Sequence, residues 1–230
     1  MLSLFEASFY LAYFLLAGSS VLTGIEIFNY YPKKYQVLKY ILAIETTVNL
    51  IASVAYNNLL KLSSASTIDY GTITSFRYLD WICTTPLLLI SLTLYLEYQK
   101  NQDQNHDQNQ DQQPKFDYSK LGIIILLNIF MLLFGYLGET NKINYILACI
   151  LGFIPFFIMF YLIWKWYGNY NKNITIYTIF VFVWSLYGIV YFLPKNSKNI
   201  SYNILDIIAK VGFGILIWFE VVNLRFNNQI

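Results

Sequence analysis

Charged residues are scarce in this chain of 230 residues. They make up 12% of the sequence, about half of the share that is usual in soluble domains, whereas hydrophobic residues make up 57%. A soluble fold needs polar residues to cover its surface, and a mean hydropathy of +0.48 leaves too few of them. The same composition excludes intrinsic disorder, and a net charge of only +2 excludes a nucleic-acid-binding protein. The sequence therefore predicts a polytopic, multi-pass protein of the lipid bilayer.

Cysteine and histidine are also rare. The two cysteines, Cys83 and Cys149, both fall in apolar segments, which excludes a secreted disulfide scaffold. The one histidine, His106, lies in a polar tract without partners. We therefore expect no metal site, and we interpret the cysteines as small packing residues.

Long apolar segments occupy most of the chain. Seven segments of roughly 20 mostly apolar residues can each cross a bilayer as a helix, and they are too long and continuous for the strands of a membrane β-barrel. They lie at residues 4–28, 36–60, 75–96, 121–137, 145–166, 175–193 and 200–224. The sequence predicts one all-α domain over residues 1–230, a bundle of seven transmembrane helices.

The polar segments between these spans indicate the orientation. Basic residues near span ends mark the cytoplasmic side, and a bundle with its N-terminus outside places the larger group of them inside. The inner group is Lys33, Lys34, Lys39, Lys100, Lys115, Lys120, Lys165, Lys172 and Arg225, and the outer group is Lys61, Lys142, Lys195 and Lys198. We therefore expect the N-terminus outside and the C-terminus in the cytoplasm. The tract NQDQNHDQNQDQQ at residues 101–113 is predicted to be a disordered polar cytoplasmic loop.

Four ionisable residues stand out among those inside the predicted spans, because a charge near the centre of the bilayer costs roughly 2.5 to 3.5 kcal/mol. Arg77 and Asp80 are three residues apart, and Asp206 and Lys210 are four apart, so each pair lies on one face of its helix. If the two faces meet, two carboxylates balance two cations. A purely structural ion-pair cluster is the alternative, although buried ion pairs rarely add net stability.

Lys210 is also a candidate nucleophile, because a desolvated lysine tends to lose its proton and its amine can then form a Schiff base with an aldehyde. Large flat side chains on other helices suit an elongated conjugated ligand, or they simply form a core. The candidate neighbours on the third and sixth spans are the aromatic residues Trp81, Trp184 and Tyr187 together with Thr84, Thr85 and Leu88.

The motifs RYLDWICTTPLLL (77–89), WSLY (184–187) and LDIIAKVGFG (205–214) resemble those of the microbial (type I) rhodopsins in order, spacing and residue choice. The resemblance extends over all seven spans. It implies that Lys210 carries all-trans retinal as a protonated Schiff base, with Asp80 and Asp206 as counterions, Arg77 beneath them, and Asp80 as proton acceptor after illumination. It further assigns the retinal pocket to Tyr56, Trp81, Thr85, Leu88, Met131, Gly135, Cys149, Phe153, Trp184 and Tyr187, with Tyr56 matching a tyrosine near the counterions. It implies a photoreceptor and not an enzyme.

Within that family, the residues Asp80, Thr84 and Ser91 of the third span resemble the viral branch. Thr84 lies one turn from Asp80 and is expected to hydrogen-bond to it. Efficient outward proton pumps carry a carboxylic acid where this chain has Ser91, and a serine hydroxyl is too weak an acid to return a proton. Lys198 occupies the position of a proton-releasing glutamate, so fast proton release is not expected.

A polar stripe on the second span suggests what is transported. Glu45, Asn49, Ser53 and Asn57 recur every four residues, and Glu26 of the first span can extend the row. The stripe is either the wall of a hydrated cation path or a seam of interhelical hydrogen bonds worth about 0.6 kcal/mol each. We expect a light-gated channel for monovalent cations or protons, in a homo-oligomer such as a trimer or pentamer. An outward proton pump with slow reprotonation and a photosensor that signals through a partner are the alternatives.

Overall fold

The computed structural model describes residues 3–104, 117–168 and 173–227. Within them the chain forms seven helical rods, as predicted. The first six are α1 (Leu4–Ile27), α2 (Gln36–Ser63), α3 (Tyr70–Gln104), α4 (Tyr118–Glu139), α5 (Tyr145–Ile163) with the π-helical turn η2 (Trp164–Gly168), and α6 (Asn173–Val190). The seventh is α7 (Lys195–Asp206), the π-helical turn η3 (Ile207–Gly212) and α8 (Phe213–Phe226), which follow one another without a break. A short 3₁₀ turn, η1 (Lys33–Tyr35), precedes α2.

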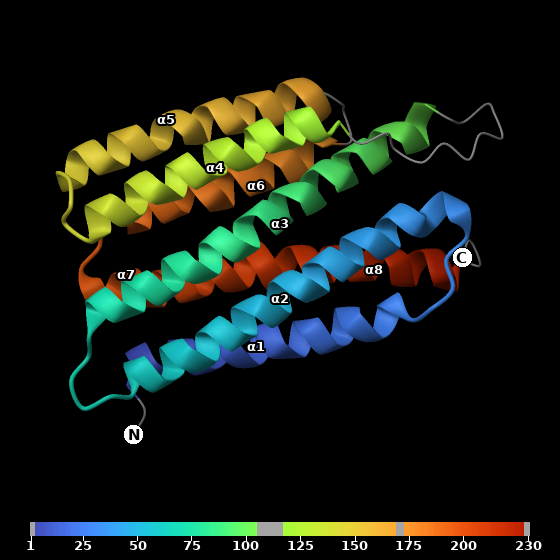
Figure 1. Ribbon diagram of the computed structural model, residues 1–230. Coiled ribbons are helices and arrows are strands. Elements are labelled where there is room, and N and C mark those ends of the chain that lie inside the picture. Colours follow the sequence, from blue (N-terminus) through green and yellow to red (C-terminus); the bar gives the residue numbers. More distant parts are fainter. Residues whose placement is uncertain (1–2, 105–116, 169–172, 228–230) are drawn as a thin grey trace.

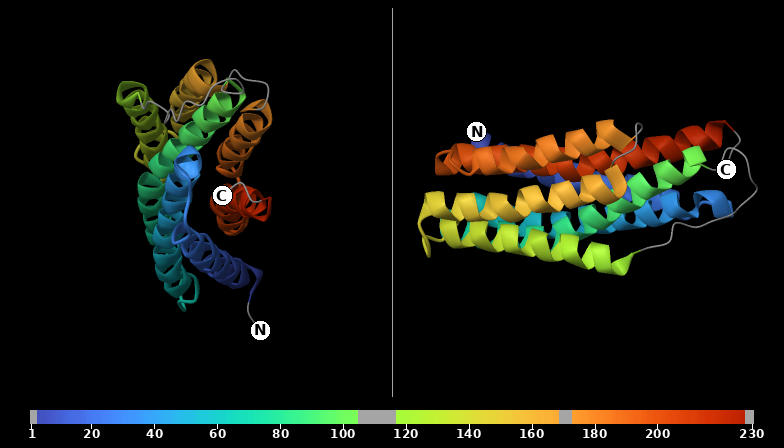
Figure 2. Two further views of the ribbon diagram at one scale, coloured as in Figure 1. Left: turned by 90° about the vertical axis from the view of Figure 1, so that its right-hand side faces the viewer. Right: turned by 90° about the horizontal axis from the view of Figure 1, so that it is seen from above.

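The rods lie side by side along one axis (Figure 1). Consecutive helices pack against each other, and the seventh rod closes the bundle because it contacts α1, α2 and α6. Figure 2 shows this arrangement from one end and from above. We call the end with the N-terminus and the α2–α3, α4–α5 and α6–α7 connections the N-terminal end, and the opposite end the C-terminal end.

The outer face is apolar and the interior holds polar groups, as expected for a protein in lipid. Phe14, Phe157 and Phe182 point outward and are 65%, 63% and 62% exposed. In the described residues, six rods are long and apolar enough to cross a membrane. The seventh rod is divided by η3, and it carries Asp206 and Lys210, both buried.

Local signals explain where several helices begin. Ser3 and Glu6 form a reciprocal capping box at α1, and Asn144 caps α5 by accepting hydrogen bonds from two backbone N–H groups. Pro194 directly precedes α7, where its fixed backbone angle favours a helix start.

Several predicted boundaries differ from those of the structure, and two of the differences have a clear local cause. The seventh rod begins at Lys195 rather than at residue 200, because Pro194 starts the helix instead of opening a longer loop. The third helix continues through residues 101–104, the start of the predicted polar loop, because no proline or glycine stops it there and glutamine is a good helix former. The remainder of that predicted loop, with His106, lies outside the described residues.

Candidate functional site

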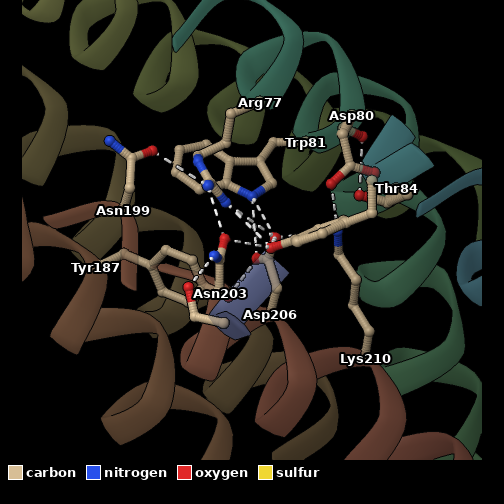
Figure 3. Close-up of polar contacts among 11 residues, drawn as sticks. Arg77, Asp80, Trp81, Thr84, Tyr187, Asn199, Asn203, Asp206 and Lys210 are labelled. Carbon is tan, nitrogen blue, oxygen red and sulfur yellow. Dashed lines mark hydrogen bonds and ion pairs between the residues drawn. The ribbon is translucent and has the colours of Figure 1, made fainter. Parts of the chain in front are cut away.

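The two predicted charge pairs meet in the middle of the bundle. Lys210 Nζ lies 2.5 Å from Asp80 Oδ2 and 3.6 Å from Asp206 Oδ2, and Arg77 Nη1 lies 3.6 Å from Asp206 Oδ2. Figure 3 shows α3 carrying Arg77 and Asp80 toward the seventh rod. All four side chains are at most 2% exposed. Two carboxylates thus face two cations away from solvent.

Arg77 is held by a network that the sequence motifs do not include. Its guanidinium donates to Tyr56 Oη at 3.1 Å, to Asn199 Oδ1 at 3.2 Å and to Asn203 Oδ1 at 2.8 Å. Asn203 in turn donates to Ser8 Oγ of α1. A signal for these partners exists in the sequence, because Asn199, Asn203 and Asp206 recur at helical spacing on one face of α7.

The two carboxylates have different surroundings. Asp206 accepts hydrogen bonds from Tyr56 Oη at 2.8 Å, Trp81 Nε1 at 3.0 Å and Tyr187 Oη at 2.8 Å. Asp80 receives one bond, from Lys210, and in the described structure its Oδ1 has no partner. Because hydrogen bonds to a carboxylate stabilise its charged form, Asp206 is the poorer proton acceptor and Asp80 the better one.

Thr84 does not bond the Asp80 carboxylate as expected. Its hydroxyl donates to the Asp80 main-chain oxygen at 2.8 Å (Figure 3), which is the local bond that a helical threonine commonly makes.

An apolar cavity extends from Lys210 between α3, α4, α5, α6 and the seventh rod. The predicted pocket residues on its wall are Trp81, Thr85, Leu88, Met131, Gly135, Cys149, Phe153, Trp184 and Tyr187. Tyr56 is not on the wall. It lies in the Arg77 network because its hydroxyl is used by Asp206. Further wall residues, which the sequence analysis did not assign to the pocket, are Tyr78, Leu132, Ala148, Gly152, Phe156, Gly188, Tyr191, Tyr202 and Ala209.

Two glycines keep this cavity open. A methyl group on Gly135 would lie 2.6 Å from Tyr78 Oη, and one on Gly188 would overlap the Phe153 ring. Neither position has room for a larger residue without displacing an aromatic wall.

The polar stripe of α2 faces the interior on the C-terminal side of Lys210. Glu45 and Asn49 are fully buried, and Ser53 is nearly so. In the described residues, both Glu45 carboxylate oxygens and Asn49 Oδ1 lack hydrogen-bond partners, as does Ser19 Oγ on α1. Asn49 Nδ2 and Ser53 Oγ bond only main-chain oxygens of their own helix. We call Ser19, Glu45, Asn49 and Ser53 the polar seam.

Glu26 was expected to extend this row of polar groups, but its carboxylate already has partners. Its carboxylate pairs with Arg225 of α8 and accepts a hydrogen bond from Tyr31 Oη at 3.1 Å. Burial, and secondarily the charge of Glu26, raises the pKa of the Tyr31 hydroxyl, so that it remains a donor. This cluster ties α1 to α8 at the C-terminal end.

A second ion pair lies at the N-terminal end. Lys198 Nζ is 3.4 Å from Glu139 Oε2 and donates to Tyr145 Oη at 2.8 Å, while Tyr202 donates to Glu139 Oε1. Glu139 of α4, Tyr145 of α5 and Lys198 of α7 therefore meet there. The ring of Tyr191, directly after α6, lies against the lysine amine. Sequence spacing could not indicate this pair, because its members come from helices far apart in the chain.

Comparison with known proteins identifies the family. Residues 5–224 match the family model described as bacteriorhodopsin-like protein. The chain is a microbial rhodopsin. The crystal structure of viral rhodopsin OLPVRII is 31% identical and superposes with a TM-score of 0.85 over 96% of this chain and 99% of that one. The green-light absorbing proteorhodopsin of the gamma-proteobacterium EBAC31A08 is 26% identical over 191 residues, which cover 75% of this chain and 71% of that protein. Bacteriorhodopsin of Halobacterium salinarum is 23% identical over 199 residues, covering 76% and 69%.

This membership confirms the predicted family, the seven-helix membrane fold and the multi-pass location. Microbial rhodopsins bind retinal through a Schiff-base lysine and are light-driven transporters or receptors rather than enzymes. The residues of this rhodopsin fit that cofactor. Lys210 is a buried amine at one end of an elongated apolar cavity, its charge is balanced by carboxylates, and the far wall carries aromatic rings.

Proposed function

We propose that this rhodopsin binds all-trans retinal on Lys210 and is a light-gated cation channel, oriented with its N-terminal end outside. The excess of basic residues near the C-terminal end supports this orientation. When bound, retinal supplies a light-driven isomerisation and an acidic N–H at Lys210 Nζ. The chain's own residues then have to hold, accept and return that proton.

Asp80 is the group that accepts it. Its Oδ2 already lies 2.5 Å from Lys210 Nζ, and its second oxygen is free of partners among the described residues. Asp206 remains charged because three donors and Arg77 hold it. Proton transfer to Asp80 neutralises the stronger of the two ion pairs that fix Lys210, which frees the seventh rod to move relative to α3.

The polar seam supports a conducting path. Buried polar atoms are normally hydrogen-bonded, so a row of unpartnered ones in the protein is suited to bind water or a passing cation. Ser19, Asn49 and Glu45 surround Gly214 of α8, where an added methyl would lie 3.3 Å from Asn49 Nδ2 and 3.6 Å from Glu45 Cβ. Gly214 is one helical turn from Lys210, so movement at Lys210 is transmitted directly to the seam. This seam is the observation that carries the proposal.

The ends of this path are closed by the two ion pairs described above. Arg225 with Glu26 closes the C-terminal end, and Lys198 with Glu139 closes the N-terminal end. Since Arg225 is 39% exposed, its pair is the more easily hydrated and opened of the two.

An outward proton pump is the second candidate, and Glu45 favours it. This carboxyl is fully buried, and in the described residues no cation lies within ion-pair distance of it. Such a group is expected to be a neutral acid because an unpaired buried charge is very costly. It lies beside the Ser91 side chain, so it can supply the acid that Ser91 lacks.

Photocurrents under voltage clamp test both candidates. The channel predicts a light-induced current whose reversal potential follows the cation gradient, and Glu45→Gln should reduce its amplitude. The pump predicts an outward current that is insensitive to that gradient, and Glu45→Gln should slow its recovery. Absence of any photocurrent from protein that has formed a visible absorption band would contradict ion transport.

A further inference from the structure

Glu220 is an acid at the C-terminal end that the proposed function leaves without a role. It lies on α8 and is half-buried. Its Oε2 accepts a hydrogen bond from Tyr95 Oη at 2.8 Å, and its Oε1 accepts one from Gln99 Nε2 at 3.3 Å. Gln99 Nε2 also donates to Tyr95 Oη at 2.8 Å. The carboxyl is therefore held by a short network that joins α8 to α3.

Glu220 differs in charge balance from Glu26, another acid near this end. Glu26 is paired with Arg225, and a carboxylate neutralised by a guanidinium attracts protons weakly. In the part of the chain that the structure describes, no lysine or arginine pairs with Glu220. The titratable group that contacts it is Tyr95, by hydrogen bond, and the charge of Glu220 in turn acts on Tyr98. It is thus a partly accessible, unpaired carboxyl.

One face of α3 connects Glu220 with the interior of the bundle. Ser91, Tyr95 and Gln99 are four residues apart and lie on one face of the helix. Gln99 and Tyr95 contact Glu220, while Ser91 lies beside the buried carboxyl of Glu45. Along the seventh rod, the ten residues from Lys210 to Glu220 correspond to roughly 15 Å at the rise of an α-helix.

We propose that Glu220 takes up protons from the solution at the C-terminal end and delivers them inward through Tyr95. The Glu220 carboxylate binds one proton from solution and gives it to Tyr95 Oη, as the Tyr95 hydroxyl releases its own proton toward Ser91 and Glu45. Glu45, once it has given its proton to Lys210 Nζ, receives this replacement. In sum, one proton enters from solution, Glu220, Tyr95 and Glu45 each end with the protonation they began with, and only bonds to hydrogen are exchanged. The inference rests on the proposed proton transfer at Lys210, but it holds for a channel and for a pump, because either must restore that proton.

The test compares Glu220→Gln with Glu97→Gln in purified full-length protein supplied with all-trans retinal. Glu97 is a partly buried carboxyl of α3 near the same end, outside the network. After a flash, we expect Glu220→Gln to slow both the recovery of absorbance and the proton uptake reported by a pH dye, by roughly tenfold to a hundredfold. The pH dependence of recovery should flatten, added azide should restore the rate, and Glu97→Gln should behave as the unmodified protein.

Three further measurements show whether a negative result reflects a folding defect, a failure of the proposed function or a failure of this inference. An unchanged dark absorption band reports that Glu220→Gln has folded, and Tyr95→Phe, which keeps the ring packed on Phe213, should give the same slowing. The infrared difference spectrum should lose one carboxyl band in Glu220→Gln alone. If the unmodified protein takes up protons and Glu220→Gln recovers equally fast at every pH, this inference is overturned while the proposed function stands. If the unmodified protein shows no proton transfer at all, both are overturned.

Discussion

Replacing Asp80 or Asp206 by asparagine should separate the effect of a counterion on the chromophore from its effect on the stability of the protein. At an effective dielectric constant of about 20, unit charges at the 2.5 Å between Lys210 and Asp80 attract by about 7 kcal/mol, and at the 3.6 Å between Lys210 and Asp206 by about 5 kcal/mol. Asp80→Asn therefore removes the larger attraction on Nζ. We expect it to give the larger shift of the visible band to longer wavelength and to abolish proton transfer after a flash.

Stability should rank the two variants in the opposite order. Asp206→Asn removes the acceptor of Tyr56, Trp81 and Tyr187 and leaves Arg77 without its carboxylate. Breaking a buried pair in this way costs on the order of 3 to 5 kcal/mol. Asp80→Asn costs less because Asp206 still balances Lys210.

The assay measures the absorption maximum, the flash-induced proton transfer and the temperature at which the visible band bleaches, for both variants and for Glu97→Gln as a charge-matched control. The control should change none of the three. If Asp206→Asn abolished proton transfer while Asp80→Asn retained it, or if Asp80→Asn proved the less stable protein, the assignment of roles from hydrogen-bond number would be refuted.

Three further substitutions test other parts of the site. Lys210→Ala should give no visible band with all-trans retinal, and a persisting retinylidene band would disprove the attachment site. Gly188→Ala should weaken or prevent formation of the band, because its methyl overlaps the Phe153 ring; normal binding would show that the wall yields easily. Gly214→Ala narrows the polar seam toward Asn49, so photocurrent should fall with an unchanged dark spectrum, and an undiminished current would place the path elsewhere.

The sequence was sufficient for the membrane class, the seven rods and the central charges, because each depends on local patterns. Apolar length predicts a span, and spacings of three and four residues place Arg77 with Asp80 and Asp206 with Lys210 on single helix faces. The contact between the two faces depends on tertiary packing, and it agrees with the requirement that buried charges be balanced.

Other features depended on packing that no local pattern carries. Glu139 and Lys198 come from α4 and α7, and Glu220 and Tyr95 from α8 and α3, so their pairing follows only from the closed bundle. Tyr56 was grouped with the retinal pocket and matched to a tyrosine near the counterions, and its hydroxyl bonds to Asp206 while its ring lies off the cavity wall. Thr84 was expected to bond a carboxylate, but its hydroxyl donates to the Asp80 main-chain oxygen one turn earlier.

The two sides of Lys210 differ in a way that bears on the order of events. Toward the N-terminal end, Arg77, Asp206 and Asn203 form a dense network in which most polar atoms are satisfied. Toward the C-terminal end, Glu45 and Ser91 are buried with no hydrogen bond among the described residues. A satisfied network resists rearrangement, because each broken bond leaves a buried group unpaired, whereas unpartnered groups lose little by moving. Light-driven change at Lys210 should therefore propagate mainly toward the C-terminal end, and the slow, regulated steps of transport should lie on that side.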